Sequence, residues 1–141
     1  MDCIVLDSGA LQNEGGGFSG MAGGRRPEAV AMKSRILSHL REIETTENVR
    51  IVYACESGSR AWGFPSADSD YDVRFLYVHP LEWYLSVDVK RDVIERPLQG
   101  GLDISGWDLK KALQLFRKSN PPLLEWLGSP IVYLEQYSTA D

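Results

Sequence analysis

The chain has 141 residues, of which 43% are hydrophobic, and a formal net charge of −5. This length suits one domain with a buried core, and the acidic balance argues against a protein that coats duplex nucleic acid by bulk electrostatics. The two cysteines, Cys3 and Cys55, lack the spacing of a zinc site or a disulfide framework, and no stretch approaches the roughly 18 apolar residues of a membrane span. We therefore expect a soluble, cytoplasmic protein without a signal peptide.

The chain divides into two segments. Residues 1–26 are rich in glycine and end in a basic pair, so we expect a flexible leader or a tag there. Residues 27–141 are expected to form the folded core domain. Its first element is predicted as an amphipathic helix over residues 27–48, because Pro27 suits a first helical turn and apolar residues recur at helical spacing. These apolar positions are Ala29, Met32, Ile36, Leu40 and Ile43.

Two short runs of β-branched and aromatic residues follow, and both predict strands. The first covers residues 50–55 (RIVYAC) and the second covers residues 71–78 (YDVRFLYV). We expect the second to be a central strand of the sheet. The connection between them begins directly after the first strand and has room for one short helix.

A hairpin and two further helices are predicted in the C-terminal half. Residues 91–98 and 102–105 form a pair of strands turned by the glycines between them. Ser105 can then cap a helix, and residues 120–128 form a short final helix between an asparagine and a glycine. The apolar stripe of the first of these helices is Leu109, Ala112, Leu113 and Phe116. The mixture predicts an α/β (α+β) fold, a small mixed β-sheet packed against helices.

Asp70 and Asp72 stand at the start of the second predicted strand. Alternate side chains of a strand point to the same face, so these carboxylates project together, about 7 Å apart along the backbone. Such a pair is costly unless a cation lies between them, although an isolated pair could also be polar residues that open a strand. A calcium loop starting at Asp68 is excluded, because it requires glycine at the position of Val73 and glutamate at that of His79.

Two further features favour a catalytic site. Gly58 and Ser59 form a tight turn directly after the first strand, where free backbone N–H groups and a hydroxyl can bind phosphate oxygens. Asp103, flanked by apolar residues, stands on a later strand and is the candidate third carboxylate. Alternatively, Asp103 could be an edge-strand residue that faces water. Three carboxylates from two neighbouring strands can hold two magnesium ions. Together these parts predict a nucleotidyl-transfer site.

The same motifs resemble the signature of the DNA polymerase β-like nucleotidyltransferase superfamily, in which Gly-Ser is followed by Asp-x-Asp and then by a third acidic residue on another strand. Three stretches are similar to one branch of it, the predicted nucleotidyltransferases associated with RNA repair. They are ESGSRAWGFPSADSDYDVRFLYVHPLEWYLSV, LDISGWDLKKAL and SNPPLLEWLGSPIVY. The resemblance covers about residues 28–134 and implies the nucleotidyltransferase fold.

The resemblance also implies roles for the matching residues. Asp70, Asp72 and Asp103 would be the metal ligands and catalytic carboxylates, and Asp103 would also be the base for the incoming hydroxyl. Gly58 and Ser59 would contact the β- and γ-phosphates of a nucleotide. The implied cofactor is Mg²⁺, as two ions, with Mn²⁺ as the alternative.

Two arginines are the best candidates to neutralise the triphosphate or an acceptor's phosphate, because a bidentate guanidinium suits phosphate oxygens. They are Arg60 and Arg74, and each could equally be a surface salt-bridge partner. Trp62 and Phe64, inside the signature loop, are the aromatic residues best placed to stack a base, although large aromatic residues in a small domain more often belong to the core.

The function that follows is the transfer of a nucleoside monophosphate from an NTP to a hydroxyl acceptor on an RNA end, a protein or a small molecule. Proteins of this branch, as the resemblance implies, continue into a further helical region, whereas the sequence ends soon after residue 137. The alternative is therefore a catalytically weak NTP- and magnesium-binding domain, or an interaction domain of antitoxin-like or regulatory type. A homodimer or a partner chain would then cover the exposed face.

Overall fold

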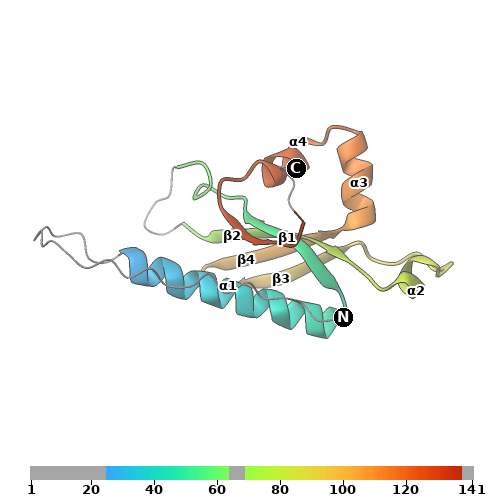
Figure 1. Ribbon diagram of the computed structural model, residues 1–141, viewed down its shortest axis with the longest axis horizontal. Coiled ribbons are helices and arrows are strands. Elements are labelled where there is room, and N and C mark those ends of the chain that lie inside the picture. The colour runs from blue at the N-terminus through green and yellow to red at the C-terminus, as the bar shows by residue number, and fades with distance from the viewer. Residues whose placement is uncertain (1–24, 64–68, 138–141) are drawn as a thin grey trace, which may run out of the picture.

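One five-stranded sheet with helices on both faces forms the molecule (Figure 1). The structure, a computed structural model, describes residues 25–63 and 69–137. Helix α1 (Arg25–Glu47) lies on one face of the sheet, and α3 (Leu109–Arg117) and α4 (Pro121–Leu127) lie on the other. The α+β fold predicted from the sequence is confirmed.

The strand order of the sheet is β3-β4-β2-β1-β5. Strand β1 (Arg50–Glu56) pairs antiparallel with β2 (Tyr71–Val78), and β2 pairs parallel with β4 (Leu102–Asp108). The edges are β3 (Val93–Gln99), antiparallel to β4, and β5 (Val132–Glu135), antiparallel to β1. The second predicted strand is therefore central, as expected. Because β2 and β4 run parallel, both begin at the same end of the sheet.

The predicted hairpin is β3 and β4. Its turn contains Gly100 and Gly101, whose φ angles of 57° and 73° suit glycine best. Strand β3 begins at Val93 rather than Arg91, and β4 continues to Asp108, three residues beyond its predicted end.

The predicted apolar face of α1 packs on the sheet. Its residues Ile36, Leu40 and Ile43 are fully buried, with Met32 packed against them, whereas Ala29 in the first turns is exposed. The β2 residues in the same cluster are Val73, Phe75 and Tyr77. Because side chains alternate along a strand, the residues between these three point to the opposite face.

That opposite face forms a second core beneath α3 and α4. Tyr53, Cys55 and Leu76 of the sheet pack there against Ala112 and other helix residues. The indoles of Trp107 and Trp126 stack in this layer, with ring centroids 3.9 Å apart. Leu123 and Trp126 are buried in the same cluster, and the partly buried side chains packed against it include Trp107, Leu115 and Leu127.

The prediction for the start of α3 was wrong. Ser105 lies within β4, and the helix begins at Leu109 with Asp108 as its N-cap, whose carboxylate accepts a hydrogen bond from Lys110 N at 2.8 Å. Gly106 accounts for part of the error, because glycine disfavours a strand in sequence-based reasoning. In the sheet, the ring of Phe75 fills the space that a Cβ at Gly106 would need.

The apolar stripe predicted for α3 is only partly buried. Ala112 is in the core, but Leu113 is 59% exposed and Phe116 is 56% exposed. Together with Tyr137 they line an apolar groove of about 500 Å³. The predicted cover of an exposed face by a second copy or a partner chain stays a prediction.

Two elements of the structure were not predicted, the short helix α2 (Leu81–Tyr84) and the edge strand β5. Residues 1–24 of the predicted leader lie outside the described residues, and α1 begins two residues before its predicted start. Among the residues that are described, no helix is long and apolar enough to cross a membrane.

Candidate active site

The first residues of β2 and β4 bring two predicted carboxylates together. Asp72 and Asp103 are register partners on these parallel strands. Val73 and Ile104, the next residues along, are buried in the cluster beneath α1, so both carboxylates point to the opposite face. Their side chains are 33% and 39% exposed. Because β4 lies between β3 and β2, Asp103 is not on an edge strand, and that alternative was wrong.

The charge on Asp72 is disfavoured by its surroundings. Burial is the main reason that the pKa of Asp72 is raised above its ordinary value. The Arg74 guanidinium acts in the opposite direction, and repulsion from Asp103 and Asp70 raises the pKa further. Asp70 itself precedes β2, is exposed, and lies beside Gly101 of the β3–β4 turn. Mutual perturbation of carboxylates is typical of functional sites.

The site offers oxygen ligands of the kind that hard cations prefer. Within residues 25–63 and 69–137, no group of three histidine, cysteine or acidic side chains is close enough to hold a metal ion as it stands. The neighbouring carboxylates of Asp72 and Asp103 nevertheless suit Mg²⁺, which binds through one or two carboxylates plus substrate phosphates and water. The donor set therefore fits the ion that the sequence predicted.

Arg74 lies between these two carboxylates. Its Nη2 is 2.8 Å from Asp103 Oδ2 and 3.7 Å from Asp72 Oδ1, and its Nη1 donates to the Val73 carbonyl at 3.1 Å. The side chain is 20% exposed. Of the two roles considered for Arg74, phosphate ligand and salt-bridge partner, the structure contains the salt bridge, and it is made with the site itself.

Gly58 lies directly over the Asp72 carboxylate. A Cβ at Gly58 would overlap Asp72 Oδ2, so no other residue fits without displacing that side chain. The chain then forms two successive turns, in which Ala61 N donates to Gly58 O at 3.0 Å and Trp62 N donates to Ser59 O at 3.2 Å. These turns occupy the described part of the connection in place of the predicted short helix. Gly58 and Asp72 are therefore neighbours, and Ser59 follows Gly58 in the chain.

Arg60 ties this loop to the start of β2. Its guanidinium carbon lies 3.9 Å from the centre of the Tyr71 ring, and its Nη2 donates to the Ser69 carbonyl at 2.8 Å. The Ser59 hydroxyl also contacts Ser69 Oγ, at 3.4 Å. The contacts described for Arg60 are thus within the protein, and its predicted contact with phosphate stays a prediction.

Glu56 was given no role by the sequence analysis. It is the last residue of β1 and is fully buried, and its carboxylate accepts hydrogen bonds from Asp72 N at 2.8 Å and from Tyr133 OH at 2.7 Å. The available signal was weak: an acidic residue that ends an apolar strand directly before the Gly-Ser turn. Such a residue normally faces solvent.

The other predicted aromatic contacts are only partly described. Trp62 is 49% exposed and remains available to stack a base, while Phe64 and Asp68 lie outside the described residues. Trp107 and Trp126 belong to the core, in agreement with the more common role of large aromatic residues.

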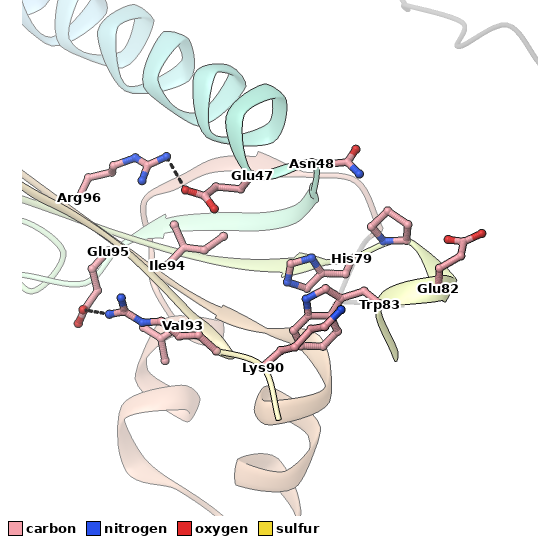
Figure 2. Close-up of a pocket in the computed structure, with 12 residues that line it drawn as sticks. Glu47, Asn48, His79, Glu82, Trp83, Lys90, Val93, Ile94, Glu95 and Arg96 are labelled. Carbon is pink, nitrogen blue, oxygen red and sulfur yellow. Dashed lines mark hydrogen bonds and ion pairs between the residues drawn. The ribbon is translucent and has the colours of Figure 1, made fainter. Parts of the chain in front are cut away.

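A separate hollow of about 600 Å³ lies at the far end of β2 (Figure 2). The ring of His79 stacks on that of Trp83, with centroids 3.9 Å apart, and Lys90 Nζ lies 5.8 Å from the Trp83 ring. Two ion pairs line its wall, Arg96 with Glu47 at 2.9 Å and Arg91 with Glu95 at 2.7 Å. None of the residues predicted for catalysis lines this hollow.

The fold and the family comparison agree on the class of protein. A mixed five-stranded sheet with helices, which sets the carboxylates of two central strands beside a Gly-Ser turn, has the nucleotidyltransferase fold that the sequence predicted. The chain belongs to the RlaP family, described as the RNA repair pathway DNA polymerase beta family, whose model matches residues 32–141. The resemblance identified from the motifs is confirmed.

A curated relative is known from Bacillus subtilis (strain 168), where it is named uncharacterized protein YcgL. It is 64% identical over 110 residues, which are 78% of this chain and 42% of the relative. The chain therefore spans about two fifths of the length of that protein. No solved structure matches the chain.

Proposed function

We propose that the protein transfers a nucleoside monophosphate from an NTP to a hydroxyl group on an RNA end, a protein or a small molecule. The observation that supports this most is the pairing of Asp72 and Asp103 on parallel strands, with Gly58 packed on the Asp72 carboxylate. Family membership supports the same class of reaction.

Asp70, Asp72 and Asp103 are the residues that would hold Mg²⁺, as two ions, or Mn²⁺ in its place. When bound, such ions neutralise charge on the phosphates and activate the attacking hydroxyl. The raised pKa of Asp72 supports this assignment, because its carboxylate is destabilised by burial and by neighbouring carboxylates and would gain from a cation.

The turn at Gly58 and Ser59 would bind the β- and γ-phosphates of the NTP. The hydrogen bonds of the turn use the carbonyls of these two residues, and within residues 25–63 and 69–137 their N–H groups donate to no other backbone carbonyl, as a phosphate-binding turn requires. Because a Cβ at Gly58 would overlap Asp72, a phosphate bound by this turn would lie next to the carboxylates.

Arg74 would exchange partners when a nucleotide binds. In the structure it balances the charges of Asp103 and Asp72. A divalent cation at these carboxylates would remove the need for this balance, and the guanidinium would become available to a phosphate oxygen. Arg60 is the second candidate for a phosphate contact, once released from Ser69.

In the reaction, the acceptor oxygen forms a bond to the α-phosphorus while the bond from that phosphorus to the bridging oxygen breaks. Pyrophosphate leaves, and the proton of the acceptor hydroxyl passes to the carboxylate of Asp103.

The test is the retention of labelled nucleotide in an acceptor, measured with each of the four NTPs and Mg²⁺. We expect Asp70→Ala and Asp72→Ala to abolish incorporation, while Asp88→Ala, an exposed carboxylate on the connection between α2 and β3, incorporates as the wild type does. Equal incorporation by the Asp72→Ala protein would remove this residue from the mechanism.

A second candidate function, that of an interaction domain, is favoured by the apolar groove. Leu113, Phe116 and Tyr137 expose more than half of their surface there. A second copy of the chain could bury this groove, because a two-fold contact brings the same patch of both copies together. Sedimentation of the wild type and of Leu113→Glu would test this, and a wild type that is monomeric at all concentrations would contradict it.

A further inference from the structure

Glu56 is a buried carboxylate whose presence needs an explanation. Its side chain is fully inaccessible, and none of the ion pairs among the described residues includes it. A carboxylate in such a position is costly unless its oxygens are hydrogen-bonded. Both oxygens are: Oε1 accepts from Asp72 N at 2.8 Å, and Oε2 accepts from Tyr133 OH at 2.7 Å.

The bond to Asp72 replaces a bond that the sheet would otherwise make. In a hydrogen-bonded antiparallel pair, each residue donates its N–H to the carbonyl of the other. Ser57 N donates to Asp72 O at 2.8 Å, so the reciprocal bond would run from Asp72 N to Ser57 O. Asp72 N instead donates to the Glu56 side chain. The carbonyl of Ser57 is thereby released from the ladder.

This release allows the chain to turn onto Asp72. Gly58 follows Ser57 directly and lies against the Asp72 carboxylate. A chain that continued the ladder would run beside β2 rather than over it. Glu56 lies on the α1 side of the sheet, as Ala54 does two residues earlier. From that side its carboxylate binds the main-chain N–H of Asp72. Gly58 packs on the Asp72 carboxylate on the opposite side of the sheet.

The carboxylate is itself fixed from a third strand. Tyr133 belongs to β5, on the other side of β1, so the bonds through Glu56 join β2, β1 and β5. The main chain of Glu56 is held as well, because Ser129 Oγ donates to its carbonyl at 2.5 Å and its N–H donates to Ile131 O at 2.9 Å. The acceptor of the Asp72 N–H therefore has little freedom to move.

We propose that Glu56 is a positioning residue for the metal and phosphate site, acting through the main chain of Asp72 and through the turn that it permits at Gly58. This inference rests on the proposed function. The chain contains a matched case without a site: Glu44 Oε1 accepts from Ile51 N at 2.7 Å, at the other end of β1. Glu44 stabilises the sheet in the same way, but it touches no predicted ligand.

The first experiment measures Mn²⁺ affinity by calorimetry on the full chain. We expect Glu56→Ala to weaken Mn²⁺ binding by about 10- to 100-fold, the range seen when a residue supporting a metal ligand is removed. Glu56→Gln keeps an oxygen acceptor for Asp72 N and should stay within about threefold of the wild type. Glu44→Ala should melt at a lower temperature and bind Mn²⁺ unchanged.

The second experiment needs no metal. Amide exchange read by NMR should be about tenfold or more faster at Asp72 in Glu56→Ala, and faster at Ile51 in Glu44→Ala, because each variant frees that one N–H. If Glu56→Ala does not fold, Tyr133→Phe takes its place. Tyr133→Phe keeps the Glu56 carboxylate but removes the hydroxyl that donates to it, and should weaken Mn²⁺ binding by about threefold.

The outcomes separate the two proposals. If the wild type binds no Mn²⁺, the proposed function fails, and an Asp72 amide that exchanges equally fast in wild type and Glu56→Ala overturns the positioning role as well. If the wild type binds Mn²⁺ and the folded Glu56 and Tyr133 variants bind it equally well, only the positioning role fails. An equal loss of affinity in Glu44→Ala would reduce Glu56 to a stabilising residue.

Discussion

The two ends of β2 differ in what they offer to a ligand. At its start, the carboxylates of Asp72 and Asp103 share one arginine, Arg74, and Gly58 packs on the Asp72 carboxylate. Burial and repulsion from neighbouring carboxylates disfavour the charge on Asp72. At its far end, the hollow of Figure 2 is about 600 Å³ in volume, but Arg96 and Arg91 in its wall are each paired with a glutamate, and its two rings are stacked on each other.

The comparison teaches that volume alone does not identify the reactive site. Charges that are paired one to one and rings that already stack gain little from a ligand, whereas two carboxylates that share a single arginine still repel one another and gain from a cation. The start of β2 is therefore the better candidate for chemistry, although the hollow at the other end is well formed.

The largest expected difference between the two ends is in activity. Asp103→Asn keeps the shape of the side chain but removes its charge, and should lower nucleotide transfer by at least about 100-fold. Trp83→Ala, in the hollow, should stay within about twofold of the wild type. The rate of labelled nucleotide incorporation measures both. A comparable loss in Trp83→Ala would move the functional site to the far end.

A methyl group at Gly58 should have the next largest effect. Gly58→Ala drives a Cβ into the Asp72 carboxylate, so magnesium-dependent NTP affinity should fall by about 10- to 100-fold. Gly63→Ala is the control in the same loop: its φ of 81° disfavours alanine, but nothing lies within 4 Å of the new methyl group. Calorimetry that finds equal losses in the two variants would attribute the effect to loop strain.

Removal of Arg74 should change two affinities in opposite directions. Arg74→Met no longer competes for Asp103, so Mn²⁺ should bind roughly three- to tenfold more tightly, while NTP should bind more weakly by a similar factor. Arg91→Met, which breaks the exposed pair with Glu95 in the hollow, should change neither. If both ligands lose affinity in Arg74→Met, the arginine does not compete with the cation for Asp103.

The smallest expected effect concerns pH at the far end. Burial lowers the pKa of His79 below its ordinary value of 6.5, with Lys90 adding to this and Asp108 and Glu47 opposing it. The folded protein therefore holds His79 neutral, and as pH falls through about 6.5 the unfolded chain binds the proton first, so stability declines. Thermal unfolding between pH 5.5 and 8 should have a smaller pH slope in His79→Phe.

His39→Gln on the exposed face of α1 is the control for that slope. His39 lies on α1, 3.7 Å from Glu42 of the same helix, and it is not among the rings packed against His79, so its replacement should leave the slope as it is in the wild type. A slope that persists in His79→Phe would assign the decline to other groups.

Much of the site could be predicted because spacing along the chain determines it. Asp72 lies at the start of β2, and the Gly-Ser turn follows β1, the strand next to it, so their meeting depends only on two neighbouring strands. Asp103 could be assigned through the resemblance, and the parallel pairing of β2 with β4 explains why it lies beside Asp72.

The rest could not be predicted because it depends on contacts between distant segments. The salt bridge of Arg74 requires the register of β2 against β4, and the burial of Glu56 requires Tyr133 of a strand that is only four residues long. The sequence predicted Ser105 as the N-cap of α3, because Gly106 disfavours a strand and β4 was therefore expected to end before it. In the structure β4 continues to Asp108, which is the N-cap.

The parallel pairing of β2 and β4 has a consequence for the order of folding. Parallel neighbours cannot be joined by a tight turn, and here α2 and β3 lie between them in the chain. Asp72 and Asp103 therefore meet only after this crossover has closed, which is a non-local step. A partly folded chain has no complete site, so a bound cation or nucleotide would stabilise the finished fold alone and would slow its unfolding.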